Sequence, residues 1–175
     1  VRRADSGERL WRYSSRLSET RGYAIGHAVD ITEQAREAEA LRAENLRDAL
    51  TQAYNRRFLP LFEARLAERT WAVINVDLDQ FKLINDTQGH DAGDQVLIAM
   101  TAYLQQQVRE GDAVVRSGGD EFLLLLADAD EGRVHGLLAR LRAGRDQAPC
   151  RYSTGHAVRQ RGEPLGDTLA RADAE

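Results

Sequence analysis

The sequence predicts a mixed α/β (α+β) fold, with strands and amphipathic helices following one another along the chain. Three observations support this prediction. Residues 71–79 form a nearly continuous apolar run, which is typical of a strand buried on both faces. Residues 113–126 hold two apolar runs around a Gly-Gly pair, which indicates a β-hairpin. Residues 95–108 carry apolar side chains at helical spacing, with Leu97 and Leu104 on one face.

The composition indicates one complete domain with an appendage. The chain has 175 residues, of which 42% are apolar, enough for one sizeable core. The formal net charge of −4 excludes a general nucleic-acid binder, whose surface would be basic. The single Cys150 excludes an internal disulfide and suits a reducing cytoplasm, where we place the protein. No run approaches the roughly 18 apolar residues of a membrane span, so we expect no membrane contact from this chain. Membrane anchoring of a longer protein is left open.

The appendage begins with two predicted strands, 10–17 and 23–29, which a polar stretch separates. Two strands cannot form a stable domain alone, so this segment needs further partners. Residues 32–50 contain neither Gly nor Pro and are rich in Ala, Glu, Arg and Leu. They predict a connecting helix that Thr32 caps.

The connecting helix has a weak apolar stripe. Ile31, Ala35, Ala38 and Leu41 recur at helical spacing, and the stripe resumes in a shifted phase beyond them. Such a stripe can pair with a second copy of itself as a short coiled coil, or it can pack on its own domain. Both interpretations stay open.

A new apolar pattern begins after Asp48. The residues that would share one helix face are Phe58, Leu59, Leu61, Phe62 and Leu66. We therefore divide the chain into an N-terminal fragment at 1–31, a helix at 32–47 and the main domain at 48–175.

Acidic residues gather where the predicted strands of this domain end. Asp77 and Asp79 leave the apolar strand on the same side, and Asp120 and Glu121 follow the glycine turn of the hairpin. Carboxylate oxygens from neighbouring strands are the ligands that Mg²⁺ takes, with Mn²⁺ as the alternative. The competing interpretation is a solvated strand end beside an ordinary hairpin.

The turn itself is Gly118-Gly119. Glycine has no side chain and tolerates positive φ, so a bulky ligand such as a nucleotide could approach the backbone there.

The segment 81–94 is dense in polar groups. Lys82 is a point cation suited to phosphate, and Asn85 and Asp94 offer acceptors that match the N1–H and N2–H₂ edge of guanine. The competing interpretation is that Asp94 caps the helix at 95–108.

Together these motifs resemble GGDEF-domain diguanylate cyclases. The motifs Asp77-Leu-Asp-Gln-Phe-Lys82, Ile84-Asn-Asp86, Gly89-His90, Gly93-Asp94 and Arg116-Ser-Gly-Gly-Asp-Glu-Phe122 occur in the order and spacing of that family. The resemblance covers residues 48–175. It implies a fold similar to the adenylyl cyclase catalytic domain and the polymerase palm, with a mostly antiparallel sheet flanked by helices.

The resemblance also implies an activity, the condensation of two GTP into cyclic di-GMP with release of two pyrophosphates. It implies that Asp77, the backbone carbonyl of Leu78 and Asp120 hold the metal. It implies roles in nucleotide binding for Asn85, His90, Asp94, Gly118 and Gly119. Lys82 would stabilise the phosphates, and Asp120 or Glu121 would help to deprotonate the ribose hydroxyl.

Arg109-Glu-Gly-Asp112 matches the RxxD product-inhibition site of the same family. Arg109 can fork onto guanine and Asp112 can accept from its N–H groups. Four strand residues at ~3.3 Å each separate this pair from the hairpin by roughly 13 Å, so it would be a second site. The competing interpretation is a solvated Arg-Asp pair at a helix end.

Since one domain of this kind binds one GTP, the resemblance implies a homodimer for catalysis. The alternative function is a catalytically weak or inactive domain that acts as a receptor for cyclic di-GMP or GTP. The N-terminal fragment resembles the end of a PAS sensor domain, through its Leu-Trp-Arg-Tyr and Asp-Ile-Thr-Glu segments. Two departures from the family pattern are Gln52-Ala53, where Gly-Leu is usual, and a chain end that precedes the basic Lys-x-x-Gly-Arg-Asn segment.

Overall fold

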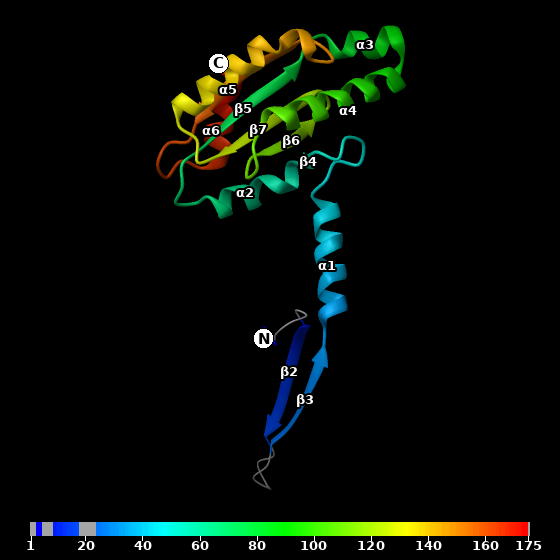
Figure 1. Cartoon of the computed structure of the whole chain (residues 1–175), viewed down its shortest axis with the longest axis vertical. Helices are drawn as coiled ribbons and strands as arrows, with labels where there is room; N and C mark the ends of the chain where they lie inside the picture. Colours follow the sequence, from blue (N-terminus) through cyan, green and yellow to red (C-terminus); the bar gives the residue numbers. More distant parts are fainter. Residues whose placement is uncertain (1–2, 5–8, 18–23, 175) are drawn as a thin grey trace. The chain divides into compact units, whose positions relative to one another are not determined.

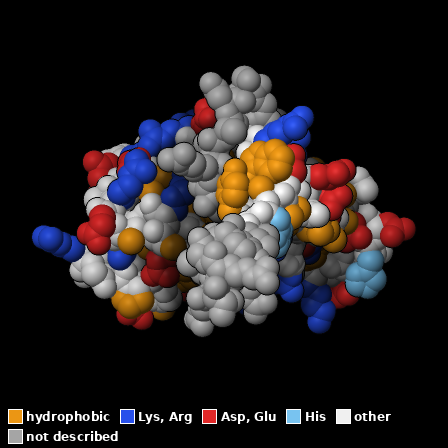
Figure 2. Space-filling model, turned by 90° about the horizontal axis from the view of Figure 1, so that it is seen from below, with side chains coloured by type: hydrophobic (Ala, Val, Ile, Leu, Met, Phe, Trp, Pro, Cys, Tyr) orange, Lys and Arg blue, Asp and Glu red, His pale blue; other side chains and the backbone are white. Residues whose placement is uncertain are grey.

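The computed structural model of the chain describes residues 3–4, 9–17 and 24–174, and it divides into two compact units (Figure 1). The first unit spans Val1–Asn45 and the second Leu46–Glu175. Within the described residues no helix is both long and apolar enough to cross a bilayer. Acidic and basic side chains both appear on the face drawn in Figure 2, in keeping with a sequence of 24 basic and 28 acidic residues.

The first unit is a three-stranded antiparallel sheet followed by a helix. Its elements are β1 (Arg3–Ala4), β2 (Arg9–Leu17), β3 (Ala24–Asp30) and α1 (Thr32–Asn45). The predicted pairing of two strands is confirmed by the β2–β3 ladder, in which Arg12 lies opposite Val29. The likeness to a PAS sensor stays a prediction, because a hairpin of this kind is common to many folds.

Helix α1 begins at Thr32, as predicted, but its capping group and its end differ from the prediction. The Thr32 hydroxyl accepts from the backbone N–H of Leu10 at 2.8 Å, so it is not the cap that the sequence suggested. The Asp30 carboxylate serves the helix start instead, because it accepts from the Thr32 backbone N–H at 3.0 Å. The helix ends at Asn45 and not at residue 50.

The early end of α1 has a local cause. The Asp48 carboxylate accepts from the backbone N–H and the hydroxyl of Thr51 at 2.9 and 2.7 Å, which folds residues 48–51 into a turn. No side chain of α1 is buried within its own unit. Coiled-coil pairing through α1 stays a prediction.

The second unit is a five-stranded sheet with helices on both faces (Figure 1). Its strands are β4 (Tyr54–Asn55), β5 (Trp71–Leu78), β6 (Ala113–Gly118), β7 (Glu121–Ala127) and β8 (Tyr152–Val158). Its helices are α2 (Leu59–Arg65), α3 (Phe81–Gln88), α4 (His90–Gln107), α5 (Glu131–Ala143) and α6 (Leu165–Asp173), with 3-10 turns at Arg56–Phe58 and Arg145–Gln147. The strand order is β4-β6-β7-β5-β8, and only the β4–β6 pair is parallel. The predicted fold class is confirmed.

The sheet separates two hydrophobic cores, because alternate residues of a strand face opposite sides. Ile74 and Val76 of β5 pack with α4 and α5, whereas Trp71 and Val73 pack with α2 and α6. Strand β5 is therefore buried on both faces, as predicted. The expected apolar face of α2 is wrong at Leu61, since this residue is 51% exposed. Within α2 only Phe62 is buried.

Helix α4 begins earlier than predicted, at His90 and not at Gln95. Gly89 ends α3 and precedes α4, and its φ of 88° is the left-handed conformation that favours glycine. Asp94 consequently lies inside α4, so the interpretation of Asp94 as a helix cap is wrong.

Candidate functional site

The hairpin β6–β7 brings its acids to the end of β5. Glu121 lies opposite Asp77 in the β5–β7 ladder, and the backbone N–H of Leu78 donates to the carbonyl of Asp120 at 3.3 Å. Burial, followed by the negative charges of Asp120, Glu121 and Asp79, raises the pKa of Asp77. The four acids that the sequence placed at two strand ends thus act on one another electrostatically.

Two of these acids have further partners. Asp79 accepts from the hydroxyl of Ser153 on β8 at 2.8 Å, which holds its carboxylate toward that strand. Glu121 lies 3.6 Å from the guanidinium of Arg56, and both side chains are exposed. Such an exposed pair contributes little to stability, so Arg56 is free to move toward an anionic ligand.

The side chain of Arg116 fixes the backbone of the glycine turn. Its Nε and Nη2 donate to the carbonyl of Gly119 at 3.0 and 2.8 Å, and its Nη1 donates to the Asp48 carboxylate at 3.0 Å. Gly119 has a φ of 48°, in the left-handed region. The guanidinium therefore fixes the backbone next to Asp120.

The Asp48 carboxylate is suited to this role. Burial would raise its pKa, but hydrogen bonds from Thr51 and then from Arg116 outweigh burial and lower the pKa of Asp48. Sequence reasoning missed the clamp of Asp48 and Arg116. The signal available was that Arg116 belongs to a motif that carries the family resemblance and that Asp48 is the first residue that the resemblance covers.

Helices α3 and α4 meet through Asn85 and Gly93. A Cβ placed at Gly93 would lie 1.9 Å from Asn85 Oδ1, so only glycine leaves room for this amide. Asn85 is half-buried against α4, beside Asp94, which is half-buried as well. The two predicted guanine-reading residues are therefore neighbours at the helix junction.

The two predicted cationic or polar contacts to the nucleotide lie on the same pair of helices. Lys82, in the first turn of α3, and His90, at the start of α4, are both exposed. Lys82 follows Asp79 by three residues in the sequence. Within the described residues, no hydrogen bond fixes the side chain of Lys82 or that of His90.

The predicted second site is a pocket of about 340 Å³ that Arg109 and Asp112 line. The Asp112 side chain is only 1% exposed, so it is not the solvated acid of the competing interpretation. Its carboxylate accepts from the backbone N–H groups of Arg109 and Ala127, each at 3.1 Å, and from Arg133 at 2.5 Å. Three donors of the fold therefore hold the Asp112 carboxylate in place.

Two cations of this pocket were missed by sequence reasoning. Arg133 and Arg140 of α5 line it together with Arg109. Arg140 donates to the backbone carbonyl of Gln107, and Arg133 to that of Ala127. Their spacing of seven residues, which is two helical turns, was the signal that they share one face of a helix.

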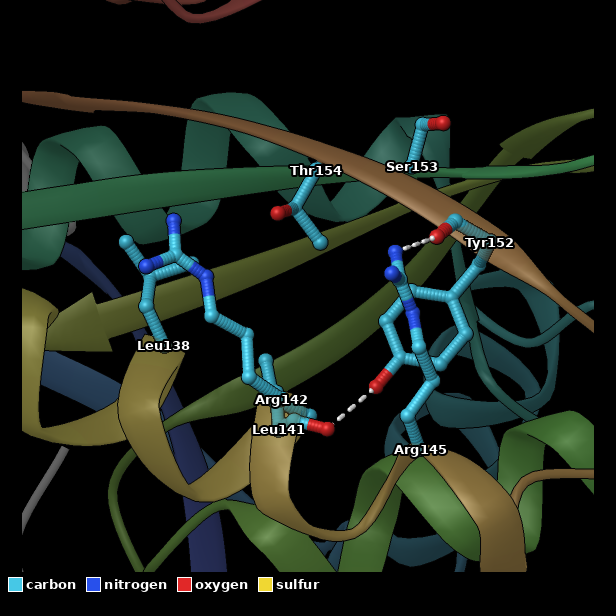
Figure 3. Close-up of a pocket in the computed structure, with 7 residues that line it drawn as sticks. All are labelled: Leu138, Leu141, Arg142, Arg145, Tyr152, Ser153 and Thr154. Atoms are coloured by element: carbon cyan, nitrogen blue, oxygen red, sulfur yellow. Dashed lines mark hydrogen bonds between the residues drawn. The ribbon is translucent and has the colours of Figure 1, made fainter.

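Another pocket, of about 370 Å³, lies between α5 and β8 (Figure 3). Arg142 and Arg145 line it, together with the hydroxyl-bearing Ser153 and Thr154. It contains none of the predicted site residues.

Known proteins resemble the second unit. The family model described as "Diguanylate cyclase, GGDEF domain" matches residues 45–174. The "Diguanylate cyclase DosC" of Escherichia coli (strain K12) is 36% identical over 126 residues, which cover 69% of this chain and 27% of that protein. The "Diguanylate cyclase TpbB" of Pseudomonas aeruginosa (strain UCBPP-PA14) is 41% identical over 120 residues, which cover 63% of this chain and 27% of that protein. The chain thus spans about a quarter of the length of these relatives.

A solved structure is similar over most of its length. The coiled coil and GGDEF domain of DgcB from Caulobacter crescentus, in complex with c-di-GMP, superposes with a TM-score of 0.72 at 27% identity, over 81% of this chain and 84% of that chain. Because the family model spans most of the chain and includes the acid cluster, the glycine turn and the α3–α4 junction, this chain belongs to the GGDEF-domain family of diguanylate cyclases.

Proposed function

We propose that the domain at 48–175 binds one GTP, and that two such domains condense two GTP into cyclic di-GMP and two pyrophosphates. The observation that carries this proposal is the acid cluster at the end of β5, which lies directly before the helix pair that holds Asn85 and Asp94. Metal-binding acids and guanine-reading groups in one place are what a GTP-dependent phosphoryl transfer requires.

The acid cluster fits a divalent cation. Mutual repulsion contributes to the raised pKa of Asp77, and a bound cation would relieve it. The donors are all oxygens, which is the set that Mg²⁺ prefers and Mn²⁺ accepts. Asp77, the carbonyl of Leu78 and Asp120 would hold the ion. When bound, the ion would neutralise phosphate charge and lower the pKa of a nearby hydroxyl.

The protein groups would orient the nucleotide around this point. Asn85 and Asp94 accept from the guanine edge, and Lys82 and His90 lie near the phosphates and the base as exposed groups that can adjust. The turn Gly118-Gly119, which Arg116 holds, leaves space for the nucleotide against the backbone.

The reaction needs a base for the ribose 3′-hydroxyl. We assign this role to Asp120 or the adjacent Glu121, of which Glu121 has a competing partner in Arg56. The hydroxyl oxygen forms a bond to the α-phosphorus of the opposite GTP, and the bond from that phosphorus to pyrophosphate breaks. The proton passes to the carboxylate, and two such steps close the ring.

Two half-sites must therefore face each other, which requires a homodimer. Helix α1 and the PAS-like fragment before it would set the distance between the two domains and so the effective concentration of one half-site at the other. We place this reaction in the cytoplasm, where the single Cys150 would stay reduced.

We infer that the pocket of Arg109 and Asp112 binds the product and inhibits the enzyme. Arg133 and Arg140 add positive charge suited to the two phosphates of cyclic di-GMP, and Asp112 would accept from a guanine N–H group. The c-di-GMP in the DgcB structure supports binding of this ligand by the fold.

The test is to incubate the purified chain, stripped of nucleotide, with GTP and Mg²⁺ and to separate the products by chromatography. Wild type should form cyclic di-GMP, and Asp120→Ala should not. Asp146→Ala removes an exposed acid outside the site and is the matched control, so it should keep wild-type activity.

The outcomes separate the proposal from its alternative. Absence of product in the wild type, together with cyclic di-GMP binding that Arg109→Ala abolishes, would identify the chain as a receptor. Product formation that survives Asp120→Ala would show that the acid cluster is not the catalytic centre.

A further inference from the structure

Metal-ligating side chains also gather away from the nucleotide site, between helix α5 and the edge strand β8. Glu131, His135 and His156 each offer one ligand atom, and these atoms all lie within 4.8 Å of one another. We propose that this cluster, the His-His-Glu cluster, binds one first-row transition-metal ion of the Zn²⁺ class.

The elements present the three ligands in a way that suits one ion. Glu131 and His135 are four residues apart on α5, so they lie on the same side of the helix, one turn apart. His156 comes from β8, where it lies opposite Ile74 of the adjacent strand. A ligand pair from one helix and a third ligand from a strand would fix the ion against a rigid sheet.

The geometry is close to that of a metal site. The imidazole ring centroids of His135 and His156 are 5.6 Å apart, with an interplanar angle of 66°. Two imidazoles on one tetrahedral ion, with bonds of ~2.0–2.1 Å, have ring centres roughly 5 Å apart. The ligand atoms must approach to about 3.3 Å, and the exposed side chains of Glu131 and His135 can rotate to achieve this.

The ligand types select the ion. Two imidazole nitrogens and one carboxylate suit Zn²⁺, which binds three protein ligands and a water in open sites. Mg²⁺ prefers oxygen ligands in octahedral geometry, so it would favour the acid cluster of β5. The chain would therefore hold two kinds of ion at separate places.

The charges along α5 favour the same place. The start of α5 lies near His156, whereas Arg145, two residues beyond the end of α5, donates to the carbonyl of Tyr152 at the start of β8 at 2.5 Å (Figure 3). Helix α5 and strand β8 therefore run antiparallel. Arg142 and Arg145 make the far end of α5 cationic. The His-His-Glu cluster lies at the acidic start of the helix, where Asp130 is the N-cap and Glu131 follows. The backbone at a helix start carries partial positive charge, so it is the carboxylate of Glu131 that supplies the negative charge for a cation there.

The test is zinc binding by the whole chain, with millimolar Mg²⁺ present to fill the acid cluster and a chromophoric chelator as competitor. One Zn²⁺ should bind per chain and should raise the melting temperature, by about 5–10 °C at a hundredfold excess over Kd. Co²⁺ in its place should give the intense visible absorption of a tetrahedral site.

Matched variants locate the ion. Removal of a group that only hydrogen-bonds to a metal ligand lowers metal affinity by about 10- to 100-fold. His135→Ala and His156→Gln each remove a ligand itself, so the affinity for Zn²⁺ should fall by at least about tenfold. His27→Ala removes a histidine of the other unit and should bind as wild type does. Glu131→Gln changes the third ligand, and because Glu131 is exposed, the substitution should not disturb the hydrophobic core.

The proposal is wrong if the wild type shows no zinc-dependent shift in melting temperature. It is also wrong if His135→Ala and Glu131→Gln, folded by circular dichroism in the presence of a chelator, bind Zn²⁺ as tightly as wild type. Zinc binding that Asp120→Ala abolishes would assign the ion to the acid cluster.

Discussion

Substitution of Gly93 by alanine tests how the structure positions Asn85. A Cβ at residue 93 would lie 1.9 Å from Asn85 Oδ1 and 3.2 Å from Cζ of Phe81. The first distance is impossible, so the Asn85 amide must rotate away from α4. We expect Gly93→Ala to weaken GTP binding without unfolding the domain.

The magnitude follows from two opposing effects on stability and one effect on binding. Alanine is favoured over glycine in a helix interior by about 1 kcal/mol. This gain offsets the packing that is lost when the half-buried Asn85 side chain moves away. The free energy of unfolding should therefore change by less than about 1 kcal/mol. A hydrogen-bond donor of guanine that loses its partner costs about 1–3 kcal/mol, which is about 5- to 150-fold in Kd.

The assay is calorimetric titration with a non-hydrolysable GTP analogue and Mg²⁺, which reports binding to one domain and does not depend on dimer formation. Gly166→Ala in α6 is the matched control, because its Cβ would meet nothing within 4 Å. It should leave Kd unchanged. Urea unfolding of both variants separates a loss of binding from a loss of structure.

A double-mutant cycle makes the test specific. If Gly93→Ala acts only by displacing Asn85, then adding it to Asn85→Ala should cost nothing more. Fully additive losses of affinity, or an unchanged Kd in Gly93→Ala, would refute the reasoning.

Three further predictions concern the frame of the domain. Arg116→Lys loses the fork onto the Gly119 carbonyl and the 3.0 Å hydrogen bond to Asp48, so the free energy of unfolding in urea should fall by about 2–3 kcal/mol, with cyclase activity lost in parallel; wild-type stability would contradict the clamp. Gln52 has a φ of 60°, so Gln52→Gly should stabilise the domain by about 0.5–1 kcal/mol in thermal or urea unfolding, and a destabilised variant would show that its side chain matters more than its backbone strain. Hydrogen bonds from Arg171, before all other causes, lower the pKa of Glu163 to about 2 from 4.5, so Glu163→Gln should lose about 2 kcal/mol near pH 7. Glu163 has a lower pKa in the folded than in the unfolded protein, so the loss of stability in Glu163→Gln relative to wild type is full above the unfolded pKa of 4.5 and should vanish as the pH falls toward 2. A loss of stability that is constant with pH would contradict the pairing of Glu163 with Arg171.

The sequence predicted the elements that have a strong period or a strong turn signal. Strand β5 was visible because a strand buried on both faces is apolar throughout, and the hairpin was visible because Gly118-Gly119 separates two apolar runs. The end of α1 and the start of α4 were wrong, because the turn at Asp48 and the positive φ of Gly89 depend on hydrogen bonds and backbone angles that composition does not show.

The candidate site divides in the same way. Residue types and their spacing predicted roles for the acids Asp77 and Asp120, the cation Lys82 and the pair Asn85 and Asp94, because each type has a definite chemistry toward metal, phosphate or guanine. The sequence also determined the family to which the chain belongs. These inferences depend on short motifs, which are present in the sequence however the chain folds.

Only the tertiary structure decided which distant residues meet. It showed Arg116 bound to both Asp48 and the glycine turn, and the amide of Asn85 lying where a Cβ of residue 93 would be. It brought Arg133 and Arg140 to the pocket of Arg109, and His156 to within reach of His135. The physical reason is that the register of β8 on β5 and the packing of α5 on the sheet are set by the whole hydrophobic core, which no short segment of the sequence contains.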